Sequence, residues 1–198
     1  RMSRLVVSAV RALELATNLG ELAGGGLVVG HGLATLEAND LYYRRIREHG
    51  AQGAEPRRFP ATSPNACAGE CAIAFRLTGP TFAVGASLHG GLEALGVARD
   101  LVAVGDSDRM LVVAADLGGP VSSALLDAAG ARPLLEGACA ALLSALPSSG
   151  SLALLSDVPR SLLDGASGAG ADWIWQGPSG HRELVGYLTA IGSCLPRC

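Results

Sequence analysis

A serine and a histidine lie within one short turn. Of the residues in this sequence, they most resemble a catalytic pair of nucleophile and general base. Residues 85–89 read Gly-Ala-Ser-Leu-His, so Ser87 and His89 stand on either side of Leu88. The start of this run matches the Gly-x-Ser-x-Gly turn on which hydrolases present a serine. His89 replaces the second glycine, and side chains two residues apart around a tight corner seldom form the hydrogen bond that activates a serine. These residues favour polar packing, with Ser87 as an alternative acyl-accepting nucleophile.

The five cysteines are the other reactive side chains, at Cys67, Cys71, Cys139, Cys194 and Cys198. An odd number without a secretory context indicates reduced thiols. Cys67 and Cys71 lie one helical turn apart, a spacing that can be imagined as half of a zinc site, but no nearby histidine completes a ligand set. The surrounding alanine-rich run favours small buried thiols. We therefore expect no metal and no cofactor.

The length, charge and composition of the chain indicate which kinds of partner to expect. A chain of 198 residues fits one ordinary domain with a good core. The net charge of −3 gives no electrostatic reason to expect nucleic-acid binding. No apolar run reaches the roughly 18–20 residues that a membrane-spanning helix needs, and no signal peptide precedes the first expected helix. We expect a cytoplasmic protein that binds neither nucleic acid nor membranes.

The elements that must position these side chains alternate between strands and helices, as in an α/β protein. Helical spacing predicts helices over residues 3–18, 36–49, 65–77 and 90–104. Apolar runs predict strands over 27–30, 81–86 and 109–115, and a hairpin of 137–146 with 151–156. A loop is expected over 51–60, a helix or loop over 120–130, a connecting loop over 157–178 and a helix over 181–191.

The strand at 81–86 turns abruptly into the helix at 90–104. A corner of this kind presents one side chain at a helix N-terminus, where free N–H groups and the helix dipole favour negative charge. A thiol or hydroxyl would gain reactivity there, but the residue at the apex is Leu88, which can be neither. A second glycine-rich strand end, Gly30-His31-Gly32, lacks the third glycine and the lysine of a phosphate loop, so nucleotide binding is discounted.

Several segments together resemble the β-ketoacyl synthases of the thiolase superfamily. GPTFAVGASLHGGLEAL, residues 79–95, is similar to the family's nucleophile corner, and Leu88 falls where the family has its cysteine. The resemblance covers roughly residues 5–155 through four further segments: LVVGHGLATLEANDLYYRRI, RRFPATSPNACAGECAIAFRLTGP, DSDRMLVVAADL and LLEGACAALLSAL.

The resemblance implies a thiolase-like layered α/β fold, present as one αβα half with a mixed sheet and reduced relative to a full ketosynthase. Residues 1–157 would form the ketosynthase N-terminal-like domain, and 158–198 a loop and helix packed on it. The family's first strand is absent, and Arg1 is an improbable native start, so we expect the sequence to begin inside a longer product. The family's two catalytic histidines belong to its second half. None of His31, His49, His89 and His181 lies in the family's histidine motifs.

Loss of the cysteine from an otherwise preserved corner resembles the chain-length factors of type II polyketide synthases, although glutamine is the usual replacement there. This implies a non-catalytic partner of a ketosynthase that shapes the acyl tunnel at a heterodimer interface, in polyketide or related polyene or fatty acyl biosynthesis. No catalytic residue is expected. The candidate tunnel and interface residues are Leu33, Leu36, Phe59, Ala66, Phe82, Ser87, Leu88 and His89.

The resemblance also implies partners. The strand at 81–86 would pair with its counterpart across a two-fold axis, as part of a heterodimer or a larger assembly with a ketosynthase. Arg44, Arg45 and Arg47 could dock an acidic acyl carrier protein, but a solvated basic helix end is the favoured explanation of these residues. Two alternatives remain: a catalytic ketosynthase or acyltransferase that uses Ser87 or another nucleophile, and a purely structural subunit.

Overall fold

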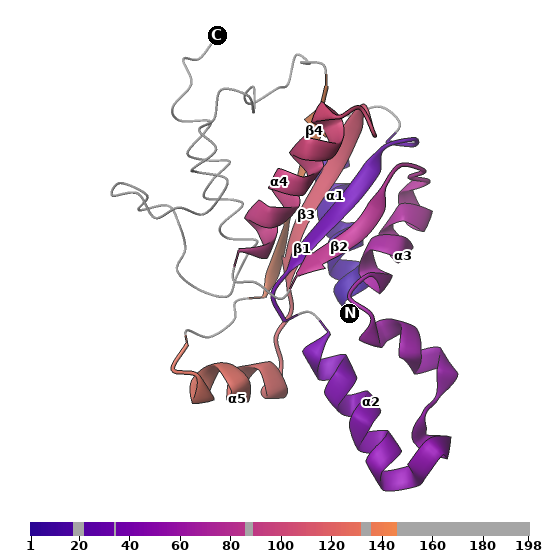
Figure 1. Ribbon diagram of the computed structural model, residues 1–198, viewed down its shortest axis with the longest axis vertical. Coiled ribbons are helices and arrows are strands. Elements are labelled where there is room, and N and C mark those ends of the chain that lie inside the picture. Colours follow the sequence, from indigo (N-terminus) through magenta and orange to yellow (C-terminus); the bar gives the residue numbers. More distant parts are fainter. Residues whose placement is uncertain (18–21, 34, 86–88, 132–135, 146–198) are drawn as a thin grey trace.

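A four-stranded mixed sheet organises the protein, with strand order β2-β1-β3-β4 (Figure 1). The computed structural model describes residues 1–17, 22–33, 35–85, 89–131 and 136–145. The helices and strands are α1 (Met2–Thr17), β1 (Gly26–His31), α2 (Leu36–His49), η1 (Gly50–Gly53), η2 (Pro56–Thr62), α3 (Ala66–Phe75), β2 (Thr81–Gly85), α4 (Gly90–Ala103), β3 (Arg109–Asp116), α5 (Pro120–Ala128) and β4 (Gly137–Ser144).

Strand β1 is the centre of the sheet, and all six of its residues are buried. It runs parallel to both neighbours, with Val28 opposite Phe82 of β2 and opposite Val112 of β3. Continuous apolar strands of this kind are typical of parallel sheets that are covered on both faces. Because the three strands are parallel, their carboxyl ends meet at one edge of the sheet.

Helices cover the two faces of the sheet and divide the core in two. Helices α1 and α3 lie on one face and α4 on the other (Figure 1). Val6 and Val10 of α1 pack with Leu27 and Val29 of β1 on the first face. The second face joins Val28 of β1 to the buried leucines of α4, Leu92 and Leu95. Because successive side chains of β1 point to opposite faces of the sheet, this strand contributes to both cores.

Helix α2 and the two 3-10 helices extend away from the sheet (Figure 1), and no residue of α2 is buried. The loop expected over residues 51–60 is wrong, because η1 and most of η2 lie within it. Pro56 at the start of η2 has the fixed φ that suits a helical first position. The Glu55 carboxylate accepts hydrogen bonds from Arg45, Arg57 and Arg58, which holds this connection in place.

Most of the predicted elements in the described ranges are confirmed within two residues of their bounds. The ambiguous segment 120–130 is helix α5, and the strand expected over 137–146 is β4. Strand β4 pairs antiparallel with β3. The expected partner strand at 151–156, the loop at 157–178, the helix at 181–191 and the expected second unit at 158–198 lie outside the described residues. The mixed α/β sheet itself was predicted correctly.

Among the helices that the structure describes, none combines the length and the apolar character needed to cross a lipid bilayer.

Candidate functional site at the carboxyl edge of the parallel strands

The expected nucleophile corner joins β2 to α4. Strand β2 ends at Gly85 and α4 begins at Gly90. His89 immediately precedes the helix, is half-buried, and accepts a hydrogen bond at its backbone oxygen from the Glu93 N–H at 3.0 Å. Ser87 and Leu88 lie outside the described residues. The strand-to-helix arrangement on either side of the corner is therefore as predicted.

Two glycines bring the first turn of α4 against the end of β1. A Cβ atom on Gly30 would lie 2.0 Å from the Gly90 carbonyl oxygen. A Cβ atom on Gly90 would lie 2.8 Å from the His31 backbone oxygen. Distances this short to backbone atoms leave no room for a side chain at either position, so both glycines are needed for the close approach. The start of α4 is thus fixed relative to β1 by backbone contact.

His31 ends β1 and lies opposite Gly85 in the sheet. Its side chain is buried, and a Cβ atom on Gly85 would lie 2.3 Å from the imidazole Cε1. The ring therefore covers the backbone at the last residue of β2. Neither ring nitrogen has a hydrogen-bond partner among the residues that the structure describes.

Asp116 ends β3 at the same edge and is 1% exposed. Its Oδ1 accepts a hydrogen bond from the Gly32 N–H at 3.2 Å, which connects the end of β3 to the residue after β1. Burial lowers the pKa of His31, while the nearby Gly32 backbone and the negative charge of Asp116 act in the opposite direction with less effect. His31 is therefore a neutral imidazole at neutral pH.

Sequence reasoning missed this pair, because it treated His31 as one of several scattered histidines. The position of the two residues in the sequence could have indicated this pair. His31 and Asp116 each end a buried apolar strand, and the carboxyl ends of parallel strands are where α/β sheets bind ligands. The pairing order of the strands, which brings the two ends together, is not readable from the two segments alone.

The described tunnel and interface residues other than His89 are spread over several elements. Leu33 and Leu36 are half-buried at the connection from β1 to α2, where the Leu36 N–H donates to the Leu33 carbonyl at 3.1 Å. Phe82 packs against the α4 side of the sheet. Phe59 is 61% exposed on η2, and half-buried Ala66 begins α3. The structure thus brings Leu33 and Leu36 together but leaves Phe82 and Phe59 in separate surroundings.

The thiols that the structure describes are free, and Cys67 and Cys71 are buried as predicted. Burial raises the pKa of Cys67 to about 11 and that of Cys71 to about 12, and burial also raises the pKa of Cys139. A thiol is a nucleophile only as the thiolate, so these three side chains are poorly reactive at neutral pH. Within the described ranges, no three histidine, cysteine or acidic side chains come together as a metal site.

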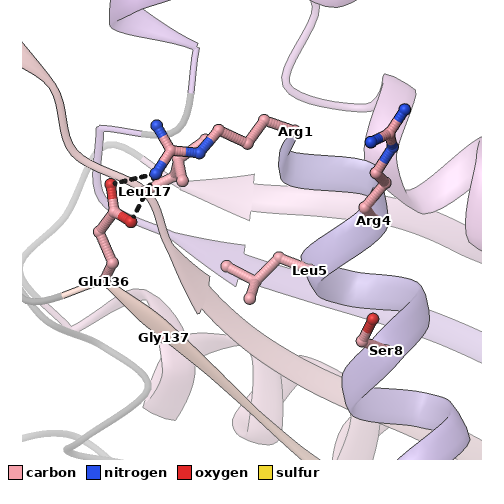
Figure 2. Close-up of a pocket in the computed structure, with 7 residues that line it drawn as sticks. All are labelled: Arg1, Arg4, Leu5, Ser8, Leu117, Glu136 and Gly137. Carbon is pink, nitrogen blue, oxygen red and sulfur yellow. Dashed lines mark hydrogen bonds and ion pairs between the residues drawn. The ribbon is translucent and has the colours of Figure 1, made fainter.

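A pocket of about 440 Å³ lies between the start of α1 and the adjoining ends of β3 and β4 (Figure 2). An ion pair of 2.8 Å between Arg1 and Glu136 crosses it, and Leu5 and Ser8 of α1 form one wall. None of the predicted tunnel residues that the structure describes lines it. Leu117 directly follows Asp116, and Gly137 pairs with Asp116 in the sheet, so the pocket lies at the same end of β3 as Asp116, on the side covered by α1, although neither His31 nor Asp116 lines it.

Comparison with solved structures defines the class of protein. The chain superimposes on the ishigamide ketosynthase/chain length factor with a TM-score of 0.64 and 26% identity, over 73% of this chain and 43% of that one. It also matches the ketosynthase ApeO in complex with its chain length factor ApeC from Xenorhabdus doucetiae, with a TM-score of 0.56 and 20% identity, over 72% of this chain and 56% of that one. The sheet and its helices are thus part of the thiolase-like α/β fold of ketosynthases.

The sequence match identifies the family. The model of the β-ketoacyl synthase N-terminal domain matches residues 3–142, and the chain belongs to this family. The 3-oxoacyl-[acyl-carrier-protein] synthase 2 of Vibrio cholerae serotype O1 is 30% identical over 114 residues, which cover 56% of this chain and 28% of that protein. The corresponding protein of Vibrio harveyi is 29% identical over 91 residues, or 46% of this chain and 22% of that protein. The chain thus matches less than a third of the length of either relative.

Proposed function

We propose that this chain is a non-catalytic, chain-length-factor-like partner of a ketosynthase, and that it shapes the acyl tunnel at the interface of a heterodimer. The observation that carries the proposal is Leu88 at the position of the family's cysteine. An aliphatic side chain cannot form the thioester on which condensation depends. The chain retains the strand that precedes this position and the helix that follows it, which supports a ketosynthase-like scaffold that lacks the family's nucleophile.

The thiols of the described residues give no substitute nucleophile. Cys67, Cys71 and Cys139 all have raised pKa values because they are buried. The name of the structure with a TM-score of 0.64 couples a ketosynthase with a chain length factor, which supports membership of such a pair. The name of the Vibrio cholerae relative includes an acyl carrier protein, which supports a carrier-bound acyl chain as the substrate of the assembly.

Leu33 and Leu36 are the residues that we propose to limit the length of the acyl chain. Both are half-buried: Leu33 lies between central strand β1 and α2, and Leu36 is the first residue of α2, a helix that extends from the body of the protein. Added bulk in a packed tunnel is costly, since surrounding side chains cannot move without strain. A larger side chain at either position would therefore stop the growing chain earlier.

The test is reconstitution with a candidate ketosynthase that has an intact cysteine. Co-expression should give a stable heterodimer, and Leu33→Phe or Leu36→Phe should shift the products to fewer carbons. Leu41→Phe is the matched control, because Leu41 is half exposed further along α2. Unchanged product length in both test variants, with heterodimers intact, would contradict the tunnel role and favour a purely structural subunit.

A second candidate function is acyl transfer through Ser87, since a serine at a strand-to-helix corner has the first half of a hydrolase elbow. Intact-mass measurement after incubation with an acyl thioester separates the two functions. The non-catalytic proposal predicts no adduct on this chain and one on the ketosynthase. A stoichiometric adduct that Ser87→Ala removes would favour the catalytic function.

A further inference from the structure

His31 is a buried polar side chain whose hydrogen bonds are not accounted for by the described residues. It is 5% exposed, and neither imidazole nitrogen has a partner among them. Leaving a buried donor or acceptor unpaired costs about 1–3 kcal/mol. Such groups are rare in folded proteins, and each one calls for a specific explanation.

The surrounding backbone is shaped to hold this ring. Gly85 lies opposite His31, and a Cβ atom there would approach three ring atoms within 2.7 Å. Gly90 leaves no space for a side chain on the other side, where its Cβ would meet the His31 backbone. The imidazole is therefore held at the carboxyl edge of the parallel strands, the usual place for ligands in this class of sheet.

The charge of the site selects the kind of ligand. Burial lowers the pKa of His31, so its ring is neutral and offers one N–H donor and one lone pair. The buried Asp116 carboxylate at the same edge adds negative potential. A phosphate or carboxylate ligand would be repelled by this carboxylate and would find no positive charge on His31. An uncharged oxygen, such as a ketone or a hydroxyl, fits the available hydrogen bonds.

We propose that His31 is a specificity-determining residue, which hydrogen-bonds a ketone or hydroxyl oxygen of the acyl chain at this edge. The inference rests on the proposed function, because it requires an acyl chain to pass the end of β1. It identifies the substrate class as oxygen-bearing acyl chains, such as 3-oxo and 3-hydroxyacyl groups. A saturated chain leaves both ring nitrogens unpaired, whereas an oxygenated chain satisfies one of them.

The experiment compares 3-oxo, 3-hydroxy and saturated acyl thioesters of equal carbon number as substrates of the heterodimer. The readout is the ratio of kcat/KM for each oxygenated substrate to that for the saturated one. His31→Leu should lower this ratio about three- to tenfold, the effect of one lost hydrogen bond. His31→Asn, which keeps a donor and an acceptor, should retain most of the preference. His49→Leu, on an exposed histidine, is the control.

A measurement on the unmodified heterodimer covers the case in which the variants do not fold. The imidazole ¹⁵N resonances of His31 should shift when a non-hydrolysable 3-oxoacyl analogue binds, and should stay in place with the saturated analogue. An unchanged kcat/KM ratio in His31→Leu, or unmoved resonances with the bound 3-oxo analogue, would overturn the assignment. If Leu33→Phe still shortened the product in the same complex, the proposed function would stand without it.

Discussion

At the scale of single residues, His31 and Glu37 give the protein two separate sensitivities to acid. His31 is buried and neutral, and burial lowers its pKa from 6.5. For Glu37, burial alone would raise the pKa, but hydrogen bonds from Ser122 and Val121, together with the charge of Arg44, lower it from 4.5. In both cases the unfolded chain takes up a proton at a higher pH than the folded chain does.

The sign of each effect follows from this order. Between pH 6.5 and the lower folded pKa of His31, the unfolded state binds more protons, so the free energy of unfolding decreases as the pH falls. The contribution of Glu37 is present above pH 4.5 and is lost only at lower pH, as the pH falls through its folded pKa. We therefore predict that His31→Gln flattens the stability profile just below pH 6.5. Urea unfolding across this range measures it, with His49→Gln as the control; equal slopes in all three proteins would contradict the prediction.

The buried thiols make a second prediction at this scale. Raising the pKa of Cys67 from 9.0 to about 11 reduces its thiolate fraction at pH 8 about a hundredfold, and Cys71 has a still higher pKa. We predict very slow alkylation of both by iodoacetamide at pH 8 in the folded protein. Peptide mass spectrometry over time measures the rate, and the same reaction in urea is the reference. Rapid folded-state labelling would show that the helix that carries them is open to solvent.

At the scale of elements, one carboxylate joins α2 to α5. Glu37 Oε1 accepts hydrogen bonds from the Ser122 N–H at 2.7 Å and the Ser122 hydroxyl at 2.9 Å, at the start of α5. A carboxylate at a helix N-terminus satisfies free N–H groups and complements the helix dipole. We predict that Glu37→Gln lowers the free energy of unfolding by about 0.5–2 kcal/mol. Glu48→Gln, on the same helix with an exposed side chain, should have little effect; equal losses would argue against this role.

Two glycines of α4 should respond to the same substitution with opposite signs. Gly90→Ala would place a Cβ atom against the backbone of His31, so strain should destabilise the protein by about 1–3 kcal/mol. Gly96 has open space around its added Cβ, and alanine there should stabilise the helix by up to about 1 kcal/mol. Denaturant unfolding of the two variants measures both effects. Stabilisation by Gly90→Ala would show that α4 does not lie this close to β1.

The sequence predictions were accurate where the residues that determine an element lie within one short segment. A continuous apolar run predicted β1 and helical periodicity predicted α4, because in each case a single segment contains the whole pattern. The 3-10 helices within residues 50–62 were missed, since they are short and the two prolines of this segment indicated a loop. The ion pair from Arg45 of α2 to Glu55 joins residues ten apart, which a short sequence pattern does not reveal. The partner of β4 within the described sheet is β3, and the sequence alone did not predict that pairing.

At the scale of the whole molecule, the proposed heterodimer makes a prediction about exposed apolar residues. Ile73 is 81% exposed on α3, the helix that begins at the candidate interface residue Ala66. Val104 is 72% exposed just beyond the end of α4. We predict that Ile73→Arg weakens association with the ketosynthase at least about fivefold, whereas Val104→Arg leaves it unchanged. Analytical ultracentrifugation of co-expressed chains measures both; equal affinities would remove α3 from the interface.

The family and the position of the corner followed from the sequence, but the composition of the strand-end site did not. The assignment of Leu88 to the family's cysteine position is a prediction from the motifs on either side of it. The approach of His31 to Gly85, and that of Asp116 to Gly32, depends on strands that are far apart in the chain and adjacent only in the sheet. A contact between side chains on neighbouring strands can be predicted only when the order of the strands in the sheet is known. The sequences of the separate strands do not give that order.

The central position of β1 also affects the protein during its synthesis. This wholly buried strand ends at His31, and its second neighbour, β3, begins at Arg109, roughly 80 residues later. At about 5–20 residues per second, a ribosome needs roughly 4–16 s to make the intervening segment. Until β3 is made, the edge of β1 that faces it has no strand to pair with, so the backbone of Leu27, Val28 and Val29 lacks its hydrogen-bond partners on that side. A chaperone that binds short apolar segments would find its target there, and would be displaced when β3 emerges and pairs.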